Sequence, residues 1–260
     1  MIDYPLRVIV FFSVLLVLLS WQTLFPRRPQ RLWKSRWLHN FSFLLINSLV
    51  LRVFQPLLLG LIAYLNPSVG ILGHLELTQG WLLFSSILLL DCAIYWQHRY
   101  THKIQWLWRL HQVHHSDVEL DVTSAVRFHP LEIIISLVYK TAIIVIFGVP
   151  VAAVILFDIL LNAAAMFNHT NIRLPSCIEY WLRKLIVTPD MHRIHHSREL
   201  AEANSNYGFC LSIWDKLFYS HTAQAKSGDA GLKIGLPKRK KRPQDSIKSL
   251  LLMPFSKLDE

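Results

Sequence analysis

Long apolar runs separated by short polar stretches dominate the first two thirds of the chain. Helices of roughly 20 apolar residues are needed to cross a bilayer, and five runs come close to or exceed that length, at residues 4–25, 41–65, 81–97, 131–147 and 151–167. Between the last two runs, Gly148-Val149-Pro150 favours a turn, so we expect those runs to form a hairpin. The pattern predicts an all-α, polytopic membrane protein with about five transmembrane helices.

The ends of the apolar runs refine this prediction. The first run is followed by Pro26-Arg27-Arg28 and not by a small-residue cleavage site, so we interpret it as a retained anchor and not as a signal peptide. After the third run, residues 103–117 mix tryptophan, leucine and valine with basic and imidazole groups. This mixture is typical of an amphipathic helix that lies at the membrane interface.

Eight of the 13 histidines fall into three clusters. The first is an HxxxH pair, and the other two share the spacing HxxHH. Residues three and four apart are neighbours on a helix surface, so each cluster turns its imidazoles toward one side. Imidazole is the commonest metal ligand in proteins, and eight imidazoles exceed the needs of one ion. We therefore predict a two-metal site built from His98, His102, His111, His114, His115, His192, His195 and His196.

The remaining histidines are interpreted one by one. His169 follows the fifth apolar run, where it would project at the level of the clusters, and we expect it to be a ligand. For His129 two interpretations stay open, a metal ligand or a residue that begins the helix ahead of Pro130. His39, His74 and His221 are interpreted as ordinary polar residues.

Composition and charge agree with membrane insertion and suggest an orientation. Apolar residues make up 53% of the chain and charged residues 17%, against about 25% charged residues in soluble domains. The loop after the first run is rich in Arg and Lys, whereas residues 66–80 contain neither. The positive-inside rule then places the first loop in the cytoplasm. Span counting puts every histidine cluster on the same face, as a cytoplasmic histidine-rich helical cap.

The net charge of +10 also has a C-terminal source, at residues 238–242. Such a basic run is either a solvated tail or a contact to anionic lipid headgroups, and nucleic-acid binding fits poorly with five spans. We divide the chain into a two-span membrane anchor (1–80), a catalytic domain with three spans and the histidine clusters (81–220), and a flexible basic cytoplasmic tail (221–260).

Two pairs of opposite charges lie inside the spans. Lys140 and Asp158 are equally far from the predicted hairpin turn, so we expect them to form an ion pair, and we suggest a similar pair between Arg52 and Asp91. The cysteines Cys92, Cys177 and Cys210 lack paired spacing and predict neither disulfides nor a thiolate metal site.

The number of imidazoles narrows the choice of metal. A structural zinc ion takes four ligands and often includes thiolates, which would leave half of these side chains without a role. Imidazole also suits iron, copper and nickel, and two redox-active irons that bind O2 beside a lipid would use the whole set. Metal-bound histidines usually donate their second N–H to an acceptor. The nearby candidates are Asp117, Glu119, Asp121, Glu132 and Asp190.

These motifs together resemble a known family. The order His98-x-x-x-His102, His111-x-x-His114-His115 and His192-x-x-His195-His196, with the segment 128–132 and His169 in between, is similar to the fatty acid hydroxylase and sterol desaturase superfamily. The segments Asn206-Tyr207-Gly208 and 214–218 resemble its closing part. The resemblance covers about residues 81–220.

The resemblance implies a membrane enzyme with a non-haem di-iron centre that uses O2 and two electrons to hydroxylate or desaturate a lipid. The resemblance also implies that the histidines of the first pair and of both triples, together with His169, are metal ligands. Some fatty acid 2-hydroxylases of the superfamily carry a further histidine where this chain has Ala165, so His129 or water would fill that place. No cytochrome b5 domain is fused, so the electrons would come from a separate reductase, ferredoxin or pterin. A bacterial inner membrane is the expected location.

Two other functions remain as alternatives. A transition-metal carrier or sensor without redox catalysis would use the clusters only to hold ions, but it predicts metal ligands along several spans. A non-catalytic relative that keeps the fold as a binding module predicts lost ligands, whereas all three clusters are complete. Fatty acyl chains, sterols, hopanoids, carotenoids and ether lipids all fit as substrates, and hydroxylation and desaturation begin with the same hydrogen abstraction.

Overall fold

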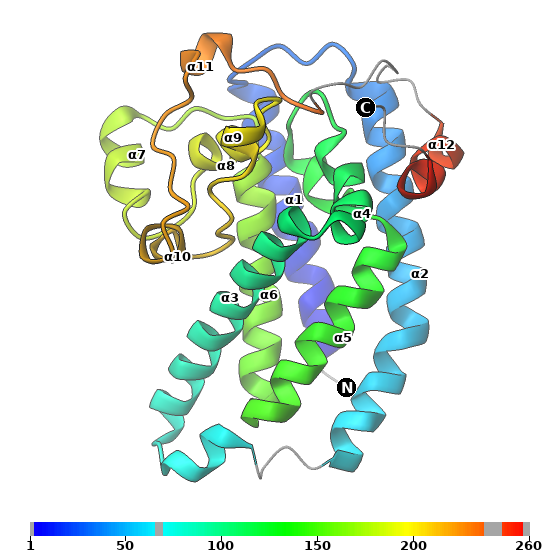
Figure 1. The fold of residues 1–260 in the computed structure, drawn as a ribbon, viewed down its shortest axis with the longest axis vertical. Coiled ribbons are helices and arrows are strands. Elements are labelled where there is room, and N and C mark those ends of the chain that lie inside the picture. Colours follow the sequence, from blue (N-terminus) through cyan, green and yellow to red (C-terminus); the bar gives the residue numbers. More distant parts are fainter. Residues whose placement is uncertain (1–2, 66–69, 237–245, 257–260) are drawn as a thin grey trace.

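A bundle of five long helices forms the body of the molecule (Figure 1). The computed structural model describes residues 3–65, 70–236 and 246–256. Each long helix is long and apolar enough to span a membrane. Within the described residues the chain forms no β-strand, which confirms the all-α prediction. The long helices are α1 (Asp3–Leu24), α2 (Trp33–Leu65), α3 (Gln79–Lys103), α5 (Pro130–Phe147) and α6 (Val151–His169).

Short helices form a cap at one end of the bundle, where α3 and α6 end and α5 begins (Figure 1). The predicted interfacial helix is α4, with Val113 buried and Trp106 exposed. The α-helices of the cap are α4 (Gln105–His115), α7 (Ser176–Leu182), α8 (Pro189–His195), α9 (Leu200–Ala203), α10 (Ile213–Leu217), α11 (Gly228–Gly231) and α12 (Ile247–Leu252). The 3-10 helices η3 (Val122–Val126) and η4 (Met253–Phe255) belong to the same end, and η2 (Ile71–Leu75) lies at the opposite end.

Two long helices extend beyond their apolar runs into the cap. The helix α2 begins at Trp33, not at residue 41, because its polar side chains find buried partners there. Asn40 donates to Thr123 Oγ1 at 2.8 Å, and Arg36 is bonded to acidic residues of the same segment. The helix α3 likewise continues to Lys103 and carries His98 and His102 into the cap.

The turn between α5 and α6 matches the predicted hairpin. Gly148 ends α5 in the left-handed conformation, with φ at +68°, and Pro150 directly precedes α6. Glycine adopts this conformation without steric cost, so the helix can stop there and reverse.

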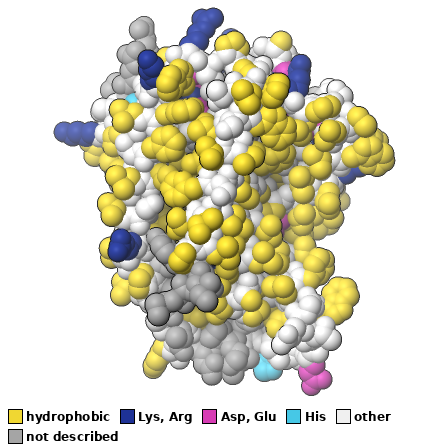
Figure 2. Space-filling view, turned by 180° about the vertical axis from the view of Figure 1, so that it is seen from behind, with side chains coloured by type: hydrophobic (Ala, Val, Ile, Leu, Met, Phe, Trp, Pro, Cys, Tyr) yellow, Lys and Arg dark blue, Asp and Glu magenta, His cyan; other side chains and the backbone are white. Residues whose placement is uncertain are grey.

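The outer surface of the bundle is largely apolar. Figure 2 shows hydrophobic side chains over most of the rear face, with the Lys and Arg side chains gathered mainly toward the upper end. Large apolar side chains of the first two helices point outward, among them Ile9, Leu16 and Leu57, which are 62%, 65% and 66% exposed. Lipid would cover such a surface, so the exposed belt agrees with a membrane-embedded bundle.

The basic first loop lies at the capped end. The backbone N–H of Arg27 donates to the carbonyl of Asn171 at 2.8 Å, and Arg28 donates to the carbonyl of Leu232 at 2.9 Å. The loop and the histidine clusters therefore share one end of the bundle, as span counting predicts.

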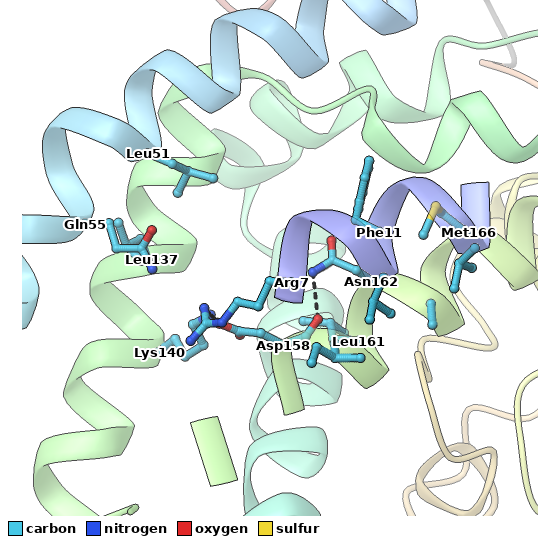
Figure 3. Close-up of a pocket in the computed structure, with 14 residues that line it drawn as sticks. Arg7, Phe11, Leu51, Gln55, Leu137, Lys140, Asp158, Leu161, Asn162 and Met166 are labelled. Atoms are coloured by element: carbon cyan, nitrogen blue, oxygen red, sulfur yellow. Dashed lines mark hydrogen bonds and ion pairs between the residues drawn. The ribbon is translucent and has the colours of Figure 1, made fainter. Parts of the chain in front are cut away.

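The charge pair predicted inside the hairpin is confirmed. Lys140 Nζ lies 2.6 Å from Asp158 Oδ1, and Arg7 of α1 adds a second, unpredicted partner at 2.9 Å from Asp158 Oδ2. Figure 3 shows the three side chains converging on a cavity of about 210 Å³ between the helices. The cluster holds two cations and one anion.

The suggested pair between Arg52 and Asp91 is wrong. The side chain of Arg52 is exposed, whereas Asp91 is buried and accepts hydrogen bonds from the segment that follows the last histidine cluster. Its donors are the backbone N–H groups of Cys210 and Leu211 and the indole Nε1 of Trp214. These three donors satisfy the buried carboxylate of Asp91, which an exposed side chain on α2 does not reach.

Asp158→Asn should destabilise the bundle because it leaves Arg7 and Lys140 without a counter-charge. Removing one partner of a buried pair costs about 3–5 kcal/mol, and partial exposure of these side chains reduces our expectation to about 2–3 kcal/mol. The melting temperature in detergent measures the effect, with the exposed Glu199→Gln as the control. Equal melting temperatures for the two variants would contradict it.

Part of the predicted tail is packed against the cap. Leu250 of α12 is 1% exposed and contacts Phe43 and Val113, and Ile234 is buried against Leu120. The prediction of a flexible tail is therefore wrong for residues 221–236 and 246–256, because their apolar side chains bury surface on the cap. The basic run 238–242 lies outside the described residues. The cysteines Cys92, Cys177 and Cys210 are free thiols, as predicted.

Candidate metal centre

Nine of the ten candidate ligands gather in two adjacent groups inside the cap. Within each group the candidate ligand atoms all lie within 4.8 Å of one another. The five-histidine group consists of His98, His102, His111, His115 and His195, and the four-histidine group consists of His114, His169, His192 and His196. Each HxxHH triple contributes to both groups.

Helix geometry explains how each triple is divided. Successive residues are rotated by about 100°, so the fifth position of HxxHH lies about 40° from the first, and the fourth lies about 60° away on the other side. Accordingly, His111 and His115 point into the five-histidine group and His114 into the other. On α8, His192 and His196 share the four-histidine group, whereas His195 joins the five-histidine group. The motif thus lets one helical turn contribute to both histidine groups.

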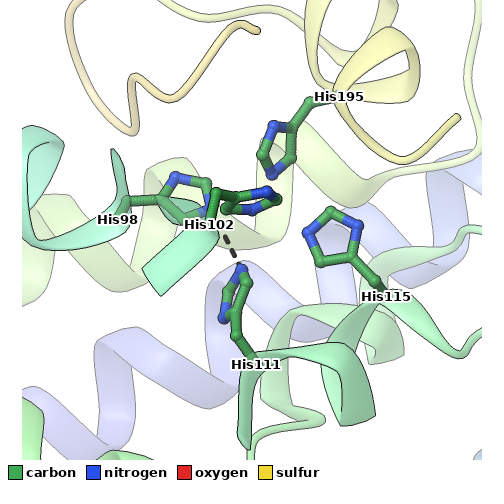
Figure 4. A group of neighbouring side chains, drawn as sticks. All are labelled: His98, His102, His111, His115 and His195. Atoms are coloured by element: carbon green, nitrogen blue, oxygen red, sulfur yellow. Dashed lines mark hydrogen bonds between the residues drawn. The ribbon is translucent and has the colours of Figure 1, made fainter. Parts of the chain in front are cut away.

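The five-histidine group has the donor set of a metal site (Figure 4). His98 Nε2 lies 3.2 Å from His111 Nε2. The Nε2 atoms of His102, His115 and His195 are buried and have no hydrogen-bond partner. A buried polar atom without a partner costs roughly 1–3 kcal/mol, and three of them around one point fit a bound cation.

The four-histidine group converges in the same way. Successive Nε2 atoms of His114, His169, His192 and His196 lie 3.1, 3.0 and 3.1 Å apart. Nitrogens bound at about 2.1 Å and at right angles on one ion would be roughly 3.0 Å apart. The spacing of these atoms therefore fits a transition metal.

Hydrogen bonds on the opposite ring nitrogen orient four of the imidazoles. The Nδ1–H of His111 donates to Glu132 Oε1 at 2.6 Å, which confirms one of the five predicted carboxylate partners. Backbone carbonyls accept in the other three cases. The bonds join His98 to Tyr207 O at 2.7 Å, His195 to Ser205 O at 2.7 Å and His169 to Ala165 O at 2.6 Å. Each bond leaves Nε2 free to bind a metal ion.

The other four predicted carboxylates serve the frame of the cap and not the ligands. Asp117 and Asp121 are bonded to Arg36. Glu119 accepts the backbone N–H groups of the first loop at Arg31 and Leu32, and Asp190 forms an ion pair with Arg27.

The loop at Tyr207 is fixed by a buried carboxylate that sequence reasoning did not assign. Asp215 accepts the backbone N–H groups of Tyr207 and Gly208, both at 2.8 Å. A side chain at position 208 would meet Asp215 Oδ2 at 2.9 Å and Leu211 O at 2.8 Å, so only glycine fits there. Burial raises the pKa of Asp215 to about 6. The Asn-Tyr-Gly segment of the sequence motif thus presents the carbonyl of Tyr207 to His98.

His129 stands apart from both groups. Its Nδ1 accepts the backbone N–H of Leu131 at 3.2 Å, and its Nε2 lies 3.1 Å from the carbonyl of Leu251. Because both ring nitrogens are engaged at the start of α5, the structure favours the helix-start interpretation over a ligand role. His39, His74 and His221 also lie outside both groups.

Burial keeps the candidate ligand histidines in the neutral form that binds metals. Burial lowers the pKa of His195 to about 3, although its bond to Ser205 opposes the shift. Burial and the neighbouring imidazoles also hold the pKa values of His114, His115, His192 and His196 well below their usual range. The centre is therefore ready to accept cations at neutral pH.

The metal-free protein should lose stability as the pH falls below about 6.5. The unfolded chain binds protons on histidine near pH 6.5, whereas folded His195 does so only at about pH 3. Between these values the unfolded state binds more protons, so each such histidine lowers the stability by about 1.4 kcal/mol per pH unit. Melting temperatures of chelator-treated protein measure this dependence, and a flat profile from pH 6.5 to 5 would contradict it.

An apolar cavity of about 230 Å³ adjoins the five-histidine group. His98 and His111 line it together with side chains of the membrane-spanning helices, among them Leu51, Ile94 and Leu161. Ala165 also faces this cavity. The cavity joins the candidate metal centre to the apolar interior of the bundle.

Comparison with known proteins agrees with this arrangement. A family model described as "Fatty acid hydroxylase" matches residues 83–220. The chain is 28% identical over 172 residues to the ornithine lipid hydroxylase OlsE of Rhizobium tropici, covering 64% of this chain and 51% of that relative. It is 31% identical over 153 residues to the alkylglycerol monooxygenase of Homo sapiens, covering 58% of this chain and 33% of that relative. The chain thus spans about half or less of these relatives, and no solved structure matches it.

Proposed function

Since this chain belongs to the fatty acid hydroxylase family, we propose that it is a membrane oxidoreductase that hydroxylates a C–H bond of a lipid, using O2 and two iron ions. One observation carries the proposal. Nine imidazoles, eight of them buried, form two adjacent groups, and an apolar cavity leads from them into the membrane-spanning helices. Such a cavity suits a lipid chain and excludes most polar substrates.

The five-histidine and four-histidine groups would each hold one iron ion. Imidazole nitrogen suits iron, and the irons would supply the reduction of O2 and the abstraction of hydrogen from an unactivated C–H bond. Because His129 is engaged elsewhere and Ala165 offers no ligand, a water molecule would complete the four-histidine group when a metal ion is bound.

The protein side chains position the substrate and keep water away. Phe128, Ile133 and Phe209 line the cavity beside His98 and His111, so a methylene chain there would replace water at the metal centre. Glu132 lines the same cavity and orients His111. The reacting carbon would lie between this apolar wall and the five-histidine group.

Glu132→Gln should weaken metal binding without unfolding the cap. Glutamine keeps the size of the side chain but loses the charge that supports His111, and such losses typically cost 10–100-fold in metal affinity. Competition with a chelator measures the affinity for the metal, and Glu119→Gln, which removes a carboxylate outside the ligand set, is the control. An unchanged affinity in Glu132→Gln would argue against a supporting role.

The membrane topology follows from the basic first loop. Placing that loop in the cytoplasm would orient the whole cap, with the metal centre, toward the cytoplasm of a bacterial inner membrane. A separate electron-transfer protein or small reductant would then reach the centre from the same side. The basic run 238–242 would contact anionic lipid headgroups. The segment 81–220 would be the catalytic domain, with 1–80 as its membrane anchor.

Lipid analysis of expressing cells tests the proposed reaction. Cells expressing the wild-type chain should contain a lipid that has gained one oxygen atom, absent from cells expressing His114→Ala. Growth with isotopically heavy O2 should transfer the label into this product. Ornithine lipids and alkylglycerols, which appear in the names of the two relatives, are the first substrates to supply. Loss of two hydrogens without label would indicate desaturation, and no change in any lipid despite two bound irons would refute catalysis.

A further inference from the structure

A buried arginine on the helix of the last histidine cluster lacks an ionic partner. Arg193 of α8 is only 3% exposed, and its Nη2 donates to Asn171 Oδ1 at 2.9 Å. Its Nε atom is buried without a hydrogen-bond partner. Among the described residues, no carboxylate lies within ion-pair distance of this guanidinium. Buried charges are normally paired, because an unpaired one loses its hydration without compensation.

The side chain of Arg193 lines two cavities of the cap. The first, which we call the arginine cavity, has a volume of about 360 Å³ and is lined by Arg27, Arg173, Arg183, Asp190, Arg193 and Asp229, among others. The second, of about 280 Å³, is lined by Arg28, Arg198 and Lys233 as well as by Arg193, with Glu119 as its one carboxylate among the described residues. Cations therefore line both cavities beside Arg193.

The nearby carboxylates do not balance these cations. Asp229 alone serves Arg27 at 2.8 Å, Arg28 at 3.3 Å and Arg173 at 2.7 Å, and Asp190 is paired with Arg27. Arg183 has its own partner in Glu179 at 3.7 Å. Four guanidiniums, those of residues 27, 28, 173 and 193, thus share two carboxylates, which leaves a surplus of two positive charges.

We propose that the arginine cavity binds a phosphate group through Arg193 and Arg27. Forked guanidiniums match the oxygens of phosphate in geometry and charge, and the surplus of two charges equals the charge of a phosphate dianion. The Nε atom of Arg27 is also buried and without a partner, so two unused donors are available. The phosphate group belongs either to a soluble anion or to a lipid headgroup. No histidine is among the described residues that line this cavity, and the binding of phosphate there goes beyond the proposed reaction.

Phosphate binding is measured on the full-length protein in detergent by titration calorimetry and by melting temperature. Inorganic phosphate should bind saturably and raise the melting temperature, whereas chloride at equal ionic strength should not. Arg193→Gln should weaken phosphate binding by about tenfold or more, as expected for the loss of a charge-assisted bond. Lys248→Gln, which removes an exposed cation on α12, is the control and should leave binding unchanged.

A second variant keeps the test decisive if Arg193→Gln does not fold. Asp229→Asn removes a carboxylate that competes with the ligand, so it should bind phosphate more tightly than the wild type. A soluble short-chain phosphatidate forms the second arm. Binding of phosphatidate alone would support a lipid headgroup as the source, and equal binding of inorganic phosphate would support a soluble anion. If neither probe binds, or if Asp229→Asn binds phosphate more weakly, the proposal is overturned.

Discussion

Replacing His114 and its neighbour His115 with alanine, one at a time, should remove different metal ions. His115 points into the five-histidine group and His114 into the four-histidine group. Each variant should therefore bind about one iron per chain where the wild type binds two, and each should lose at least about a hundredfold in lipid hydroxylation, in line with the sensitivity of metal sites to their supporting groups. Metal analysis of purified protein, together with product formation, measures both effects.

Double variants that combine one substitution from each HxxHH triple distinguish the two proposed metal ions. His115→Ala combined with His195→Ala removes two ligands of one group, so the pair should still bind one iron. His115→Ala combined with His192→Ala damages both groups and should bind almost none. His129→Ala, which lies outside both groups, is the control and should keep two irons. Equal iron contents in the two double variants would contradict the division of ligands.

Arg36→Met should destabilise the cap more than any other single change outside the ligands. Arg36 is 1% exposed and donates from Nη2 to Asp117 and from Nη1 to Asp121, both at 2.7 Å. Burial alone would raise the pKa of Asp117, but Arg36 and Arg127 hold it well below its usual range. Without Arg36, two buried carboxylates lose their main counter-charge, which costs about 3–5 kcal/mol.

Thermal unfolding in detergent measures the effect of Arg36→Met. The exposed Arg31→Met in the basic loop that precedes α2 is the control, and it should change the melting temperature little. Iron content should also fall in Arg36→Met, because Asp117 follows α4 and fixes the end of the helix that carries His111, His114 and His115. A melting temperature equal to that of the control would show that the buried network is dispensable.

The sequence predicted those parts of the structure that depend on local spacing. Apolar runs placed all five long helices, and equal distances from one turn paired Lys140 with Asp158. The HxxHH spacing placed three imidazoles on one side of a helix. Once α8 packs beside α4, the rotation per residue accounts for the division of each triple between the two groups. Such features need only the geometry of a single helix or hairpin.

Features that depend on distant partners were not predictable in this way. Asp91 looked like a partner for a basic residue on the preceding span, but its donors are backbone groups far along the chain. The backbone carbonyls of Ala165, Ser205 and Tyr207 orient three of the candidate ligand histidines. Because every residue has such a carbonyl, no side-chain pattern in the sequence marks these positions. The polarity of Arg36 and its neighbours predicts a loop, whereas in the structure Arg36 lies in α2, where its buried acidic partners hold it.

The position of the Tyr207 loop has a consequence for biosynthesis. Domains form from the N-terminus as the chain is made, and here the five spans precede His192, His195, His196 and the carbonyl acceptors at residues 205 and 207. A ribosome would therefore add the last ligands only after it has synthesised all of the spans. Neither iron could then be held by a full set of imidazoles in a nascent chain, so metal loading becomes a late step that favours completed, inserted molecules over truncated ones.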